Sequence, residues 1–380
     1  MPITRRNLLH GIAAGTVVAA GAGSVAALAA DALPHSLPNP PPPGPTLLNR
    51  NENPYGPSEK VLAVIRGAAS VSGRYPRGEY DVLRNTLAGL HKVKPEQIVL
   101  GVGSSEILRM AGAAYLGPNE KLLVPDPTYP SLANYAEANG VPVVKIPFTR
   151  TSEHDTEVML AKVDSTTALV YLCNPNNPTG TLTPRKNLES LISKLPAEVM
   201  ILVDEAYHHY VSATAAYRSF LDFPLGDPRI IVARTFSKIY GLAGLRIGYS
   251  VSSKEVAARL SALRLQNGVT TPSVKAAIAA LEDTAYVRLA AKRNSDDRQE
   301  FMNQVNARML RVIDSHANFV LLNPLRPVSE VLPHLEKNNV LVAPPIPAMD
   351  KYIRVSLGTP AEMQEFWRVW DLMPPSKMAM

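Results

Sequence analysis

Five short runs of apolar and β-branched residues, each followed by a loop and a helical pattern, constrain the fold of this chain more than any other feature. Amphipathic helices are expected between several of the runs, for example at Tyr80–His91 and Ser104–Tyr115. Strands that are apolar throughout, rather than at alternate residues, are typical of a parallel sheet covered on both faces. The sequence therefore predicts an α/β fold with a mostly parallel sheet. The five runs are Gln97–Leu100, Lys121–Val124, Ala168–Leu172, Val199–Val203 and Arg229–Ala233.

The pattern changes after about Pro272 to long helices, followed by short strands near Phe319, Leu341 and Ile353. This change predicts a second, smaller α/β domain at the C-terminus. The predicted organisation is a signal peptide in residues 1–30, a Pro-rich linker in 31–45, an N-terminal arm in 46–73, a large domain in 74–271 and a small domain in 272–380.

The first thirty residues have the features of a targeting segment. Arg5 and Arg6 precede an apolar run, and Gly11–Leu28 consists mainly of Ala, Gly and Val without a charged residue. Ala27–Ala29 offers a small-residue cleavage site. Together they resemble a twin-arginine signal peptide, which predicts export to the periplasm and only transient contact with the membrane. A membrane anchor is the alternative, but the run is weakly hydrophobic for a span.

The composition of the rest of the chain predicts a tether and a buried cysteine, and it argues against nucleic-acid binding. Seven prolines in the twelve positions 34–45 predict an extended tether rather than a folded element. The net charge is +6, or +4 without Arg5 and Arg6, and the basic residues are scattered, so no nucleic-acid binding is predicted. Cys173 is the single cysteine and lies in an apolar run, so we expect it to be a buried packing residue.

Polar and glycine-rich segments follow the five runs, at the points where the predicted strands end. Ligands of parallel α/β sheets bind outside the carboxyl ends of the strands, so these segments are the candidates for a site. They are Gly101–Ser105, Pro125–Tyr129, Asn174–Gly180, Asp204–Tyr207 and Thr235–Lys238.

Two of these segments carry charges that need partners. Asp204 ends a very apolar run, where a carboxylate is costly unless it meets a cation such as a protonated pyridine nitrogen. A structural aspartate is the alternative. Lys238 follows Thr235 and Ser237, whose hydroxyls can bind phosphate, and Arg246 comes eight residues later. Neighbouring cations and partial burial would activate Lys238 as a nucleophile, although a solvated surface lysine is the alternative for this residue alone.

The glycine turn Gly101–Ser105 opens a predicted helix, and free N–H groups at a helix N-terminus bind anions. A dinucleotide fingerprint is a weaker interpretation, because the third glycine is absent. An ordinary helix start explains this segment equally well.

Taken together and in this order, the segments resemble the fold-type I, class I and II aminotransferases, most closely the histidinol-phosphate aminotransferase branch. The resemblance extends from Leu48–Pro57 to Arg354–Thr359. It implies a large domain with a seven-stranded sheet, a smaller α/β domain and pyridoxal 5'-phosphate as cofactor. It also implies transfer of an amino group from an amino acid or similar metabolite to a 2-oxo acid.

The resemblance assigns roles to individual residues. Lys238 would hold the cofactor as a Schiff base and later move a proton, with Asp204 on the pyridine nitrogen. Asn177 and Tyr207 would hold the ring hydroxyl, and Tyr129 would stack on the ring. The phosphate would be bound by Ser104, Ser105, Thr235, Ser237 and Arg246.

Further residues are implied for the substrate and for assembly. Tyr75 matches a tyrosine that the family supplies to the neighbouring subunit's phosphate, which implies a homodimer with shared active sites. Arg354 would bind the substrate α-carboxylate, a bidentate task that suits a guanidinium group. Asn53 and Tyr55 belong to an arm that would close over the substrate.

One departure from the family pattern bears on the substrate. Histidinol-phosphate aminotransferases usually carry an arginine for the substrate phosphate at the position where this chain has Ala343. Without that arginine a phosphate would bind poorly, and export would separate the enzyme from cytoplasmic histidine synthesis. The sequence therefore favours an amino acid, or the amino-acid end of a larger metabolite, over histidinol phosphate as the substrate.

The other candidate residues have simpler explanations. His208 and His209 are adjacent and point in different directions, so no metal site is predicted. His316 is expected to be a packing residue, and Trp367 and Trp370 have the spacing of a helix core. Two other functions stay open: an oxidase, cyclase or racemase that uses the same cofactor, and a binding module without catalysis.

Overall fold

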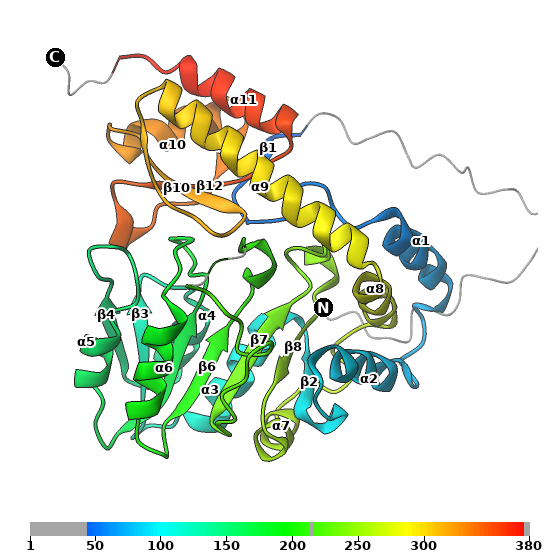
Figure 1. Cartoon of the computed structure of the whole chain (residues 1–380). Coiled ribbons are helices and arrows are strands. Elements are labelled where there is room, and N and C mark those ends of the chain that lie inside the picture. The colour runs from blue at the N-terminus through cyan, green and yellow to red at the C-terminus, as the bar shows by residue number, and fades with distance from the viewer. Residues whose placement is uncertain (1–43, 213, 215, 376–380) are drawn as a thin grey trace, which may run out of the picture. The chain divides into compact units, whose positions relative to one another are not determined.

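A seven-stranded sheet with the strand order β2-β8-β7-β6-β5-β3-β4 forms the centre of the molecule (Figure 1). The computed structural model describes residues 44–212, 214 and 216–375, so the predicted signal peptide and most of the predicted linker lie outside the described residues. All neighbouring strands are parallel except β8, which is antiparallel to β7 and β2. The strands are β2 Ile98–Gly101, β3 Lys121–Asp126, β4 Val143–Pro147, β5 Thr167–Cys173, β6 Met200–Asp204, β7 Ile230–Thr235 and β8 Gly248–Val251.

Helices cover both faces of this sheet, because alternate residues of the strands contribute to two separate cores. Along β6, for example, Ile201 and Val203 belong to one core and Leu202 to the other. The first core also includes side chains of α1 Glu59–Ala68, α2 Glu79–His91, α5 Thr156–Ala161, α6 Arg185–Lys194 and α8 Thr271–Glu282. The second includes side chains of α3 Gly103–Tyr115, α4 Ser131–Ala138 and α7 Lys254–Ser261.

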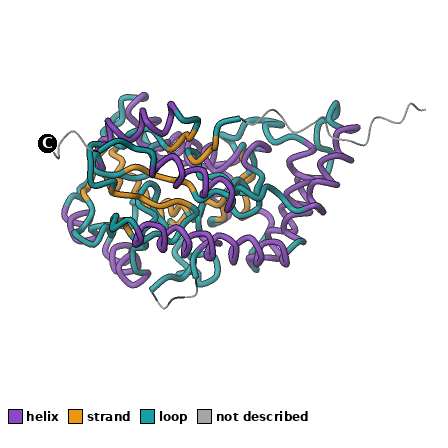
Figure 2. Tube along the Cα trace, turned by 90° about the horizontal axis from the view of Figure 1, so that it is seen from above, coloured by secondary structure: helices purple, strands orange, loops and turns teal. Residues whose placement is uncertain are grey.

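A third core lies under the C-terminal helices α9, α10 and α11, which Figure 1 shows beyond one end of the large sheet. Strands β9 Arg311–Ile313, β10 Phe319–Asn323 and β12 Ile353–Ser356 form an antiparallel sheet there, and β1 Thr46–Leu48 pairs in parallel with β11 Val340–Val342. The helices are α9 Thr284–Ala307, α10 Val328–Lys337 and α11 Pro360–Asp371. Seen from above, helices and loops surround the strands (Figure 2).

Five short 3-10 helices complete the regular structure that the described residues contain. They are η2 Ala69–Val71, η3 Pro95–Gln97, η4 His208–Tyr210, η5 Ala243–Leu245 and η6 Pro347–Met349. No helix among the described residues is both long and apolar enough to cross a membrane.

The predicted α/β fold class is confirmed, and each of the five predicted strands is present with small shifts at its ends. Two further strands of the seven-stranded sheet, β4 and β8, were not among the predicted runs, and neither were β1 and β9 outside that sheet. β4 is an edge strand with exposed Lys145, and β8 contains Gly248 and Ser250, so neither has the continuous apolar run of a central strand. The predicted internal boundaries at residues 74 and 272 stay predictions.

Candidate functional site

The carboxyl ends of β3, β5, β6 and β7 open into a cavity of about 1150 Å³. The remaining wall comes from the N-terminal arm at residues 49–52, from residues 343–348 and from Arg354 on β12. Eleven of the predicted site residues line this cavity: Ser104, Ser105, Tyr129, Asn177, Asp204, Tyr207, Thr235, Ser237, Lys238, Arg246 and Arg354. Residues far apart in the sequence therefore meet at one place, at the strand ends where a ligand was expected.

Asp204 is the last residue of β6 and is 2% exposed. Its carboxylate accepts hydrogen bonds from the Tyr171 hydroxyl at 3.0 Å and from the Ala206 N–H at 3.0 Å. Burial raises the pKa of Asp204 to about 6. Within the described part of the chain, the carboxylate forms no ion pair. A buried carboxylate with only neutral donors is an acceptor for a cationic group in the cavity.

Lys238 follows β7 and extends toward the arm. Its ammonium donates hydrogen bonds to the carbonyls of Asn51 at 2.9 Å and Arg50 at 3.2 Å. Burial, together with the charge of Arg354, lowers the pKa of Lys238 to about 8. At neutral pH about a tenth of the molecules therefore carry this lysine as a free amine, far more than for an exposed lysine. This is the state in which a lysine acts as a nucleophile or a base.

Tyr207, Asn177 and Arg354 form a hydrogen-bonded chain across the cavity. The Arg354 guanidinium donates to Asn177 Oδ1 at 2.7 Å and to the Asn49 carbonyl at 3.0 Å. The Asn177 amide in turn donates to the Tyr207 hydroxyl at 3.4 Å. The Arg354 Nε is buried and has no hydrogen-bond partner among the described residues. A half-buried, partly unsatisfied guanidinium that lines a cavity is suited to an anionic ligand.

An anion-binding corner lies where α3 begins. Gly103, at the start of α3, has φ of +70°, and a Cβ atom there would lie 2.5 Å from the Arg246 guanidinium, so glycine allows this close approach. No side chain caps the N-terminus of α3, which leaves N–H groups of its first turn available. Arg246 also donates to Ser237 Oγ at 3.3 Å. Main-chain donors, a hydroxyl and a guanidinium thus converge as a phosphate requires.

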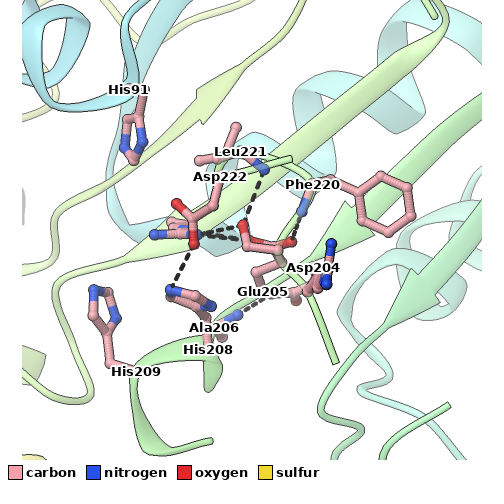
Figure 3. Close-up of polar contacts among 12 residues, drawn as sticks. His91, Asp204, Glu205, Ala206, His208, His209, Phe220, Leu221 and Asp222 are labelled. Atoms are coloured by element: carbon pink, nitrogen blue, oxygen red, sulfur yellow. Dashed lines mark hydrogen bonds and ion pairs between the residues drawn. The ribbon is translucent and has the colours of Figure 1, made fainter. Parts of the chain in front are cut away.

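A buried ion pair between Glu205 and Arg234 supports the strand ends, and Figure 3 shows Glu205 next to Asp204 with its polar contacts. Glu205, next to Asp204, accepts from Arg234 at 2.9 Å, from Ser219 Oγ at 2.7 Å and from the Phe220 N–H at 2.7 Å. Glu205 and Arg234 are both almost completely buried. Because each charge is paired and hydrogen-bonded, the cluster fixes the end of β6 against β7 and so positions Asp204.

Three predicted site residues do not line the cavity. Tyr55 donates to Asp297 on α9 at 2.9 Å, and burial raises its pKa to about 12. Asn53 donates to the Ile239 carbonyl at 2.9 Å and lines a second, smaller cavity of about 300 Å³. Tyr75 is 74% exposed. Their predicted roles stay predictions.

Sequence reasoning missed the residues that attach the arm to the site. Asn51 is buried with φ of +53°, and its amide donates to the Tyr207 hydroxyl at 3.1 Å. Its side-chain oxygen accepts from Ser356 Oγ at 3.0 Å, and its carbonyl accepts from Asn318 and Lys238. The one available signal was an Asn in a segment without regular structure, because Asn tolerates a positive φ.

The remaining candidates contact other parts of the protein. Burial raises the pKa of the Cys173 thiol, which lines the cavity at the end of β5. His208 lies 3.7 Å from Asp222 (Figure 3), and His209 lies beside Tyr240. In the described part of the chain, no cluster of His, Cys, Asp and Glu could hold a metal. His316 is half-buried beside Asp314, and Trp367 and Trp370 belong to the third core.

Comparison with known proteins identifies the family. The family model described as aminotransferase class I and II matches residues 43–369. The chain is 38% identical over 324 residues to histidinol-phosphate aminotransferase 2 of Carboxydothermus hydrogenoformans, covering 84% of this chain and 88% of that protein. It is 35% identical over 322 residues to histidinol-phosphate aminotransferase of Moorella thermoacetica, covering 84% and 83%.

A solved structure agrees with these relatives. The histidinol-phosphate aminotransferase of Sinorhizobium meliloti, in complex with pyridoxal-5'-phosphate, superposes with a TM-score of 0.79 at 28% identity, covering 86% of this chain and 89% of that one. The fold and the site are thus those of an enzyme that uses pyridoxal phosphate. The chain belongs to the aminotransferase class I and II family and is a pyridoxal-phosphate-dependent transaminase.

The residues of the cavity fit this cofactor. Asp204 would provide a buried anion for the pyridine nitrogen, and Lys238 would provide an amine with a lowered pKa for the carbonyl. The corner formed by Gly103, Ser237 and Arg246 provides donors for the phosphate. These groups lie on different strand ends, as one extended ligand would need.

Proposed function

We propose that this transaminase takes its amino group from an α-amino acid, or from the amino-acid end of a larger metabolite, and passes it to a 2-oxo acid. The observation that carries the proposal is the pairing of Arg354 with Ala343. Arg354 offers a half-buried guanidinium with an unpartnered Nε, whereas Ala343, adjacent to it in the cavity wall, offers no charge. The wall beside Arg354 therefore provides for one anionic group, the α-carboxylate.

Each residue of the site has a task in this reaction. Arg354 binds the carboxylate and so orients the α-carbon toward Lys238. Lys238 Nζ, with its lowered pKa, would take the proton from the α-carbon of the donor and pass it to the cofactor carbon that receives the amino group. Asp204 would stay anionic and so keep the pyridine nitrogen protonated, and Tyr207 and Asn177 would hold the ring hydroxyl. Bound pyridoxal phosphate supplies the carbonyl that receives the amino group and the ring that accepts the electrons of the cleaved bond.

Histidinol phosphate is the second candidate, because the relatives described above are named histidinol-phosphate aminotransferases. Its phosphate would have to use Arg354 alone in this wall. The variant Ala343→Arg tests the distinction. If the natural donor is an α-amino acid, Ala343→Arg should raise kcat/KM for histidinol phosphate about tenfold, through one added charge-assisted contact. A wild-type preference for histidinol phosphate over every amino acid would overturn the proposal.

The first experiment is a spectral titration of the purified protein with a panel of amino acids and histidinol phosphate. An absorbance change of the bound cofactor, with release of the matching 2-oxo acid, identifies the donor. Turnover without a 2-oxo acid acceptor, accompanied by loss of oxygen, would instead indicate the oxidase alternative. If the protein binds the cofactor but none of the donors alters the absorbance of the bound cofactor, the result would support a binding module without catalysis.

We also propose that the enzyme is exported by the twin-arginine route and acts in the periplasm as a homodimer. Arg5 and Arg6 support export, and the 74% exposure of Tyr75 suits a residue that completes a neighbouring subunit's site. Fractionation of cells that express the full chain should place activity in the periplasm, and Arg5→Lys with Arg6→Lys should retain it in the cytoplasm. Sedimentation should give twice the monomer mass.

A further inference from the structure

One stretch of the cavity wall is apolar and rich in proline. Residues 343–348 all line the cavity, and they are two alanines, three prolines and Ile346. The prolines have no N–H group to donate and hold φ fixed, so the segment has few donors and little freedom to turn one inward. The one N–H of Ala343 is used already, because it donates to the Arg354 carbonyl at 3.1 Å.

This wall is adjacent to the place where the substrate must lie. The hydrogen bond between Ala343 and Arg354 joins the wall to the strand that carries the proposed carboxylate-binding guanidinium. A donor held by Arg354, with its α-carbon at Lys238, therefore has its side chain within reach of residues 343–348 and the arm. All α-amino acids share the same amino and carboxylate groups. The protein residues that contact the donor's side chain therefore decide which donor is used.

The charges elsewhere in the cavity do not favour one sign. Apart from the residues assigned to cofactor and carboxylate, the charged lining residues are two basic and two acidic ones, Arg50, Lys145, Glu52 and Asp126. Lys145 is also 2.8 Å from Glu137 and lies on β4 beside Asp126 on β3. A charged side chain would leave water for a site with no net opposite charge, which is unfavourable.

We propose that residues 343–348, with Ile346 at their centre, receive the side chain of the amino donor and select an uncharged, apolar side chain of several carbons. The inference rests on the proposed function, since it requires Arg354 to bind the α-carboxylate. The substrate class is therefore apolar α-amino acids, and Ile346 is a specificity-determining residue.

A series of donors with lengthening alkyl side chains tests this inference on the complete enzyme with its cofactor. Alanine, 2-aminobutyrate, norvaline and norleucine should show kcat/KM rising by about fourfold for each methylene that the wall buries. Glutamate should react at least about tenfold more slowly than norvaline, and lysine more slowly than norleucine, because their charges lose hydration. The inference would be overturned if kcat/KM were the same across the alkyl series, if glutamate reacted faster than norvaline, or if lysine reacted faster than norleucine. In the last case the donor's side chain would contact Glu52 rather than the apolar wall.

Variants locate the effect on the wall. Ile346→Asp should lower the ratio of kcat/KM for norleucine to that for alanine by about tenfold, and Ile346→Ala by less. The matched control is Leu289→Asp, an exposed apolar residue on α9, which should leave the ratio unchanged. An unchanged ratio in Ile346→Asp would overturn the role of Ile346. If Ile346→Asp does not fold, the wild-type alkyl series still decides the substrate class.

Two outcomes distinguish the proposed side-chain selectivity from the proposed reaction. If amino acids of every side chain react equally well, the proposed function stands and the side-chain inference fails. If no amino acid reacts and histidinol phosphate does, the proposed function itself fails.

Discussion

The two walls of the cavity differ in what they are made of. The wall at the strand ends carries Asp204, Lys238 and Arg246, each with a defined partner or an altered pKa. The wall at residues 343–348 carries no ionisable side chain. A cofactor that is always the same can be bound by fixed charges, whereas the other wall decides which substrate joins it. The chemistry and the proposed specificity of this enzyme therefore lie in different parts of the wall of one cavity.

The largest expected effect comes from removing the amine of the strand-end wall. Lys238→Ala should lower kcat by at least about a thousandfold, because both the covalent link to the cofactor and the proton transfer depend on this amine. Stopped-flow measurement of 2-oxo acid formation checks the loss. Lys292→Ala, which removes an exposed lysine on α9, is the control and should retain full activity. Equal rates in the two variants would mean that the strand-end wall does not carry the chemistry.

The next effect concerns the loss of stability caused by burying the ionised carboxylate of Asp204 in that wall. Burial raises the pKa of Asp204 from 3.8 to about 6, so the folded protein holds this proton more tightly than the unfolded chain. The stability that this proton contributes is complete below pH 3.8 and is lost as pH rises through 6. In cofactor-free protein, the free energy of unfolding of Asp204→Asn should therefore rise by about 3 kcal/mol relative to wild type between pH 3 and pH 7.

Urea unfolding of the cofactor-free protein at the two pH values checks this expectation. Asp350→Asn, at an exposed position, should show the same pH dependence as wild type. If Asp204→Asn also follows wild type, the carboxylate is stabilised by contacts other than those seen here. With the cofactor present the order should reverse, because the variant loses the partner of the pyridine nitrogen.

A third effect lies at the boundary between the two walls. Arg354→Lys keeps the charge and loses the planar pair of donors, so kcat/KM for an α-amino acid should fall about a hundredfold. The expected change is mainly in KM, since Arg354 binds a group that does not react. Arg298→Lys on α9, whose guanidinium donates to a carbonyl, is a matched control outside the cavity. A fall in kcat alone would contradict a carboxylate-binding role.

The smallest effect concerns the arm that lies between the walls. Asn51→Gly keeps the positive φ and removes the hydrogen bonds to Tyr207 and Ser356, so we expect a loss of about 1–2 kcal/mol in stability. Asn51→Ala should lose about 1 kcal/mol more, because alanine disfavours a left-handed backbone. Thermal or urea unfolding of both variants measures the difference. Equal stabilities of the two variants would mean that the arm adopts another backbone conformation at this residue.

The fold was largely predictable because its central strands are apolar on both faces, and β5 and β6 are found within one residue of their predicted ends. Strands β4 and β8 were missed because edge and antiparallel strands need only part of that pattern. The strand-end wall was predictable for the same reason: a segment that directly follows a parallel strand is placed by that strand. The family resemblance then connected Arg354, on a distant strand, with this wall.

What the sequence determined by itself is the set of strands, the residues at their ends and the cofactor that those residues fit. Only the tertiary structure decided that Asn51 joins Tyr207, Ser356 and Lys238, and that residues 343–348 line the cavity at the strand ends. The physical reason is the separation in sequence between the residues that interact. A strand and the loop after it are specified by neighbouring residues, whereas the arm and the apolar wall are placed by pairings such as β1 with β11, which join residues nearly three hundred positions apart.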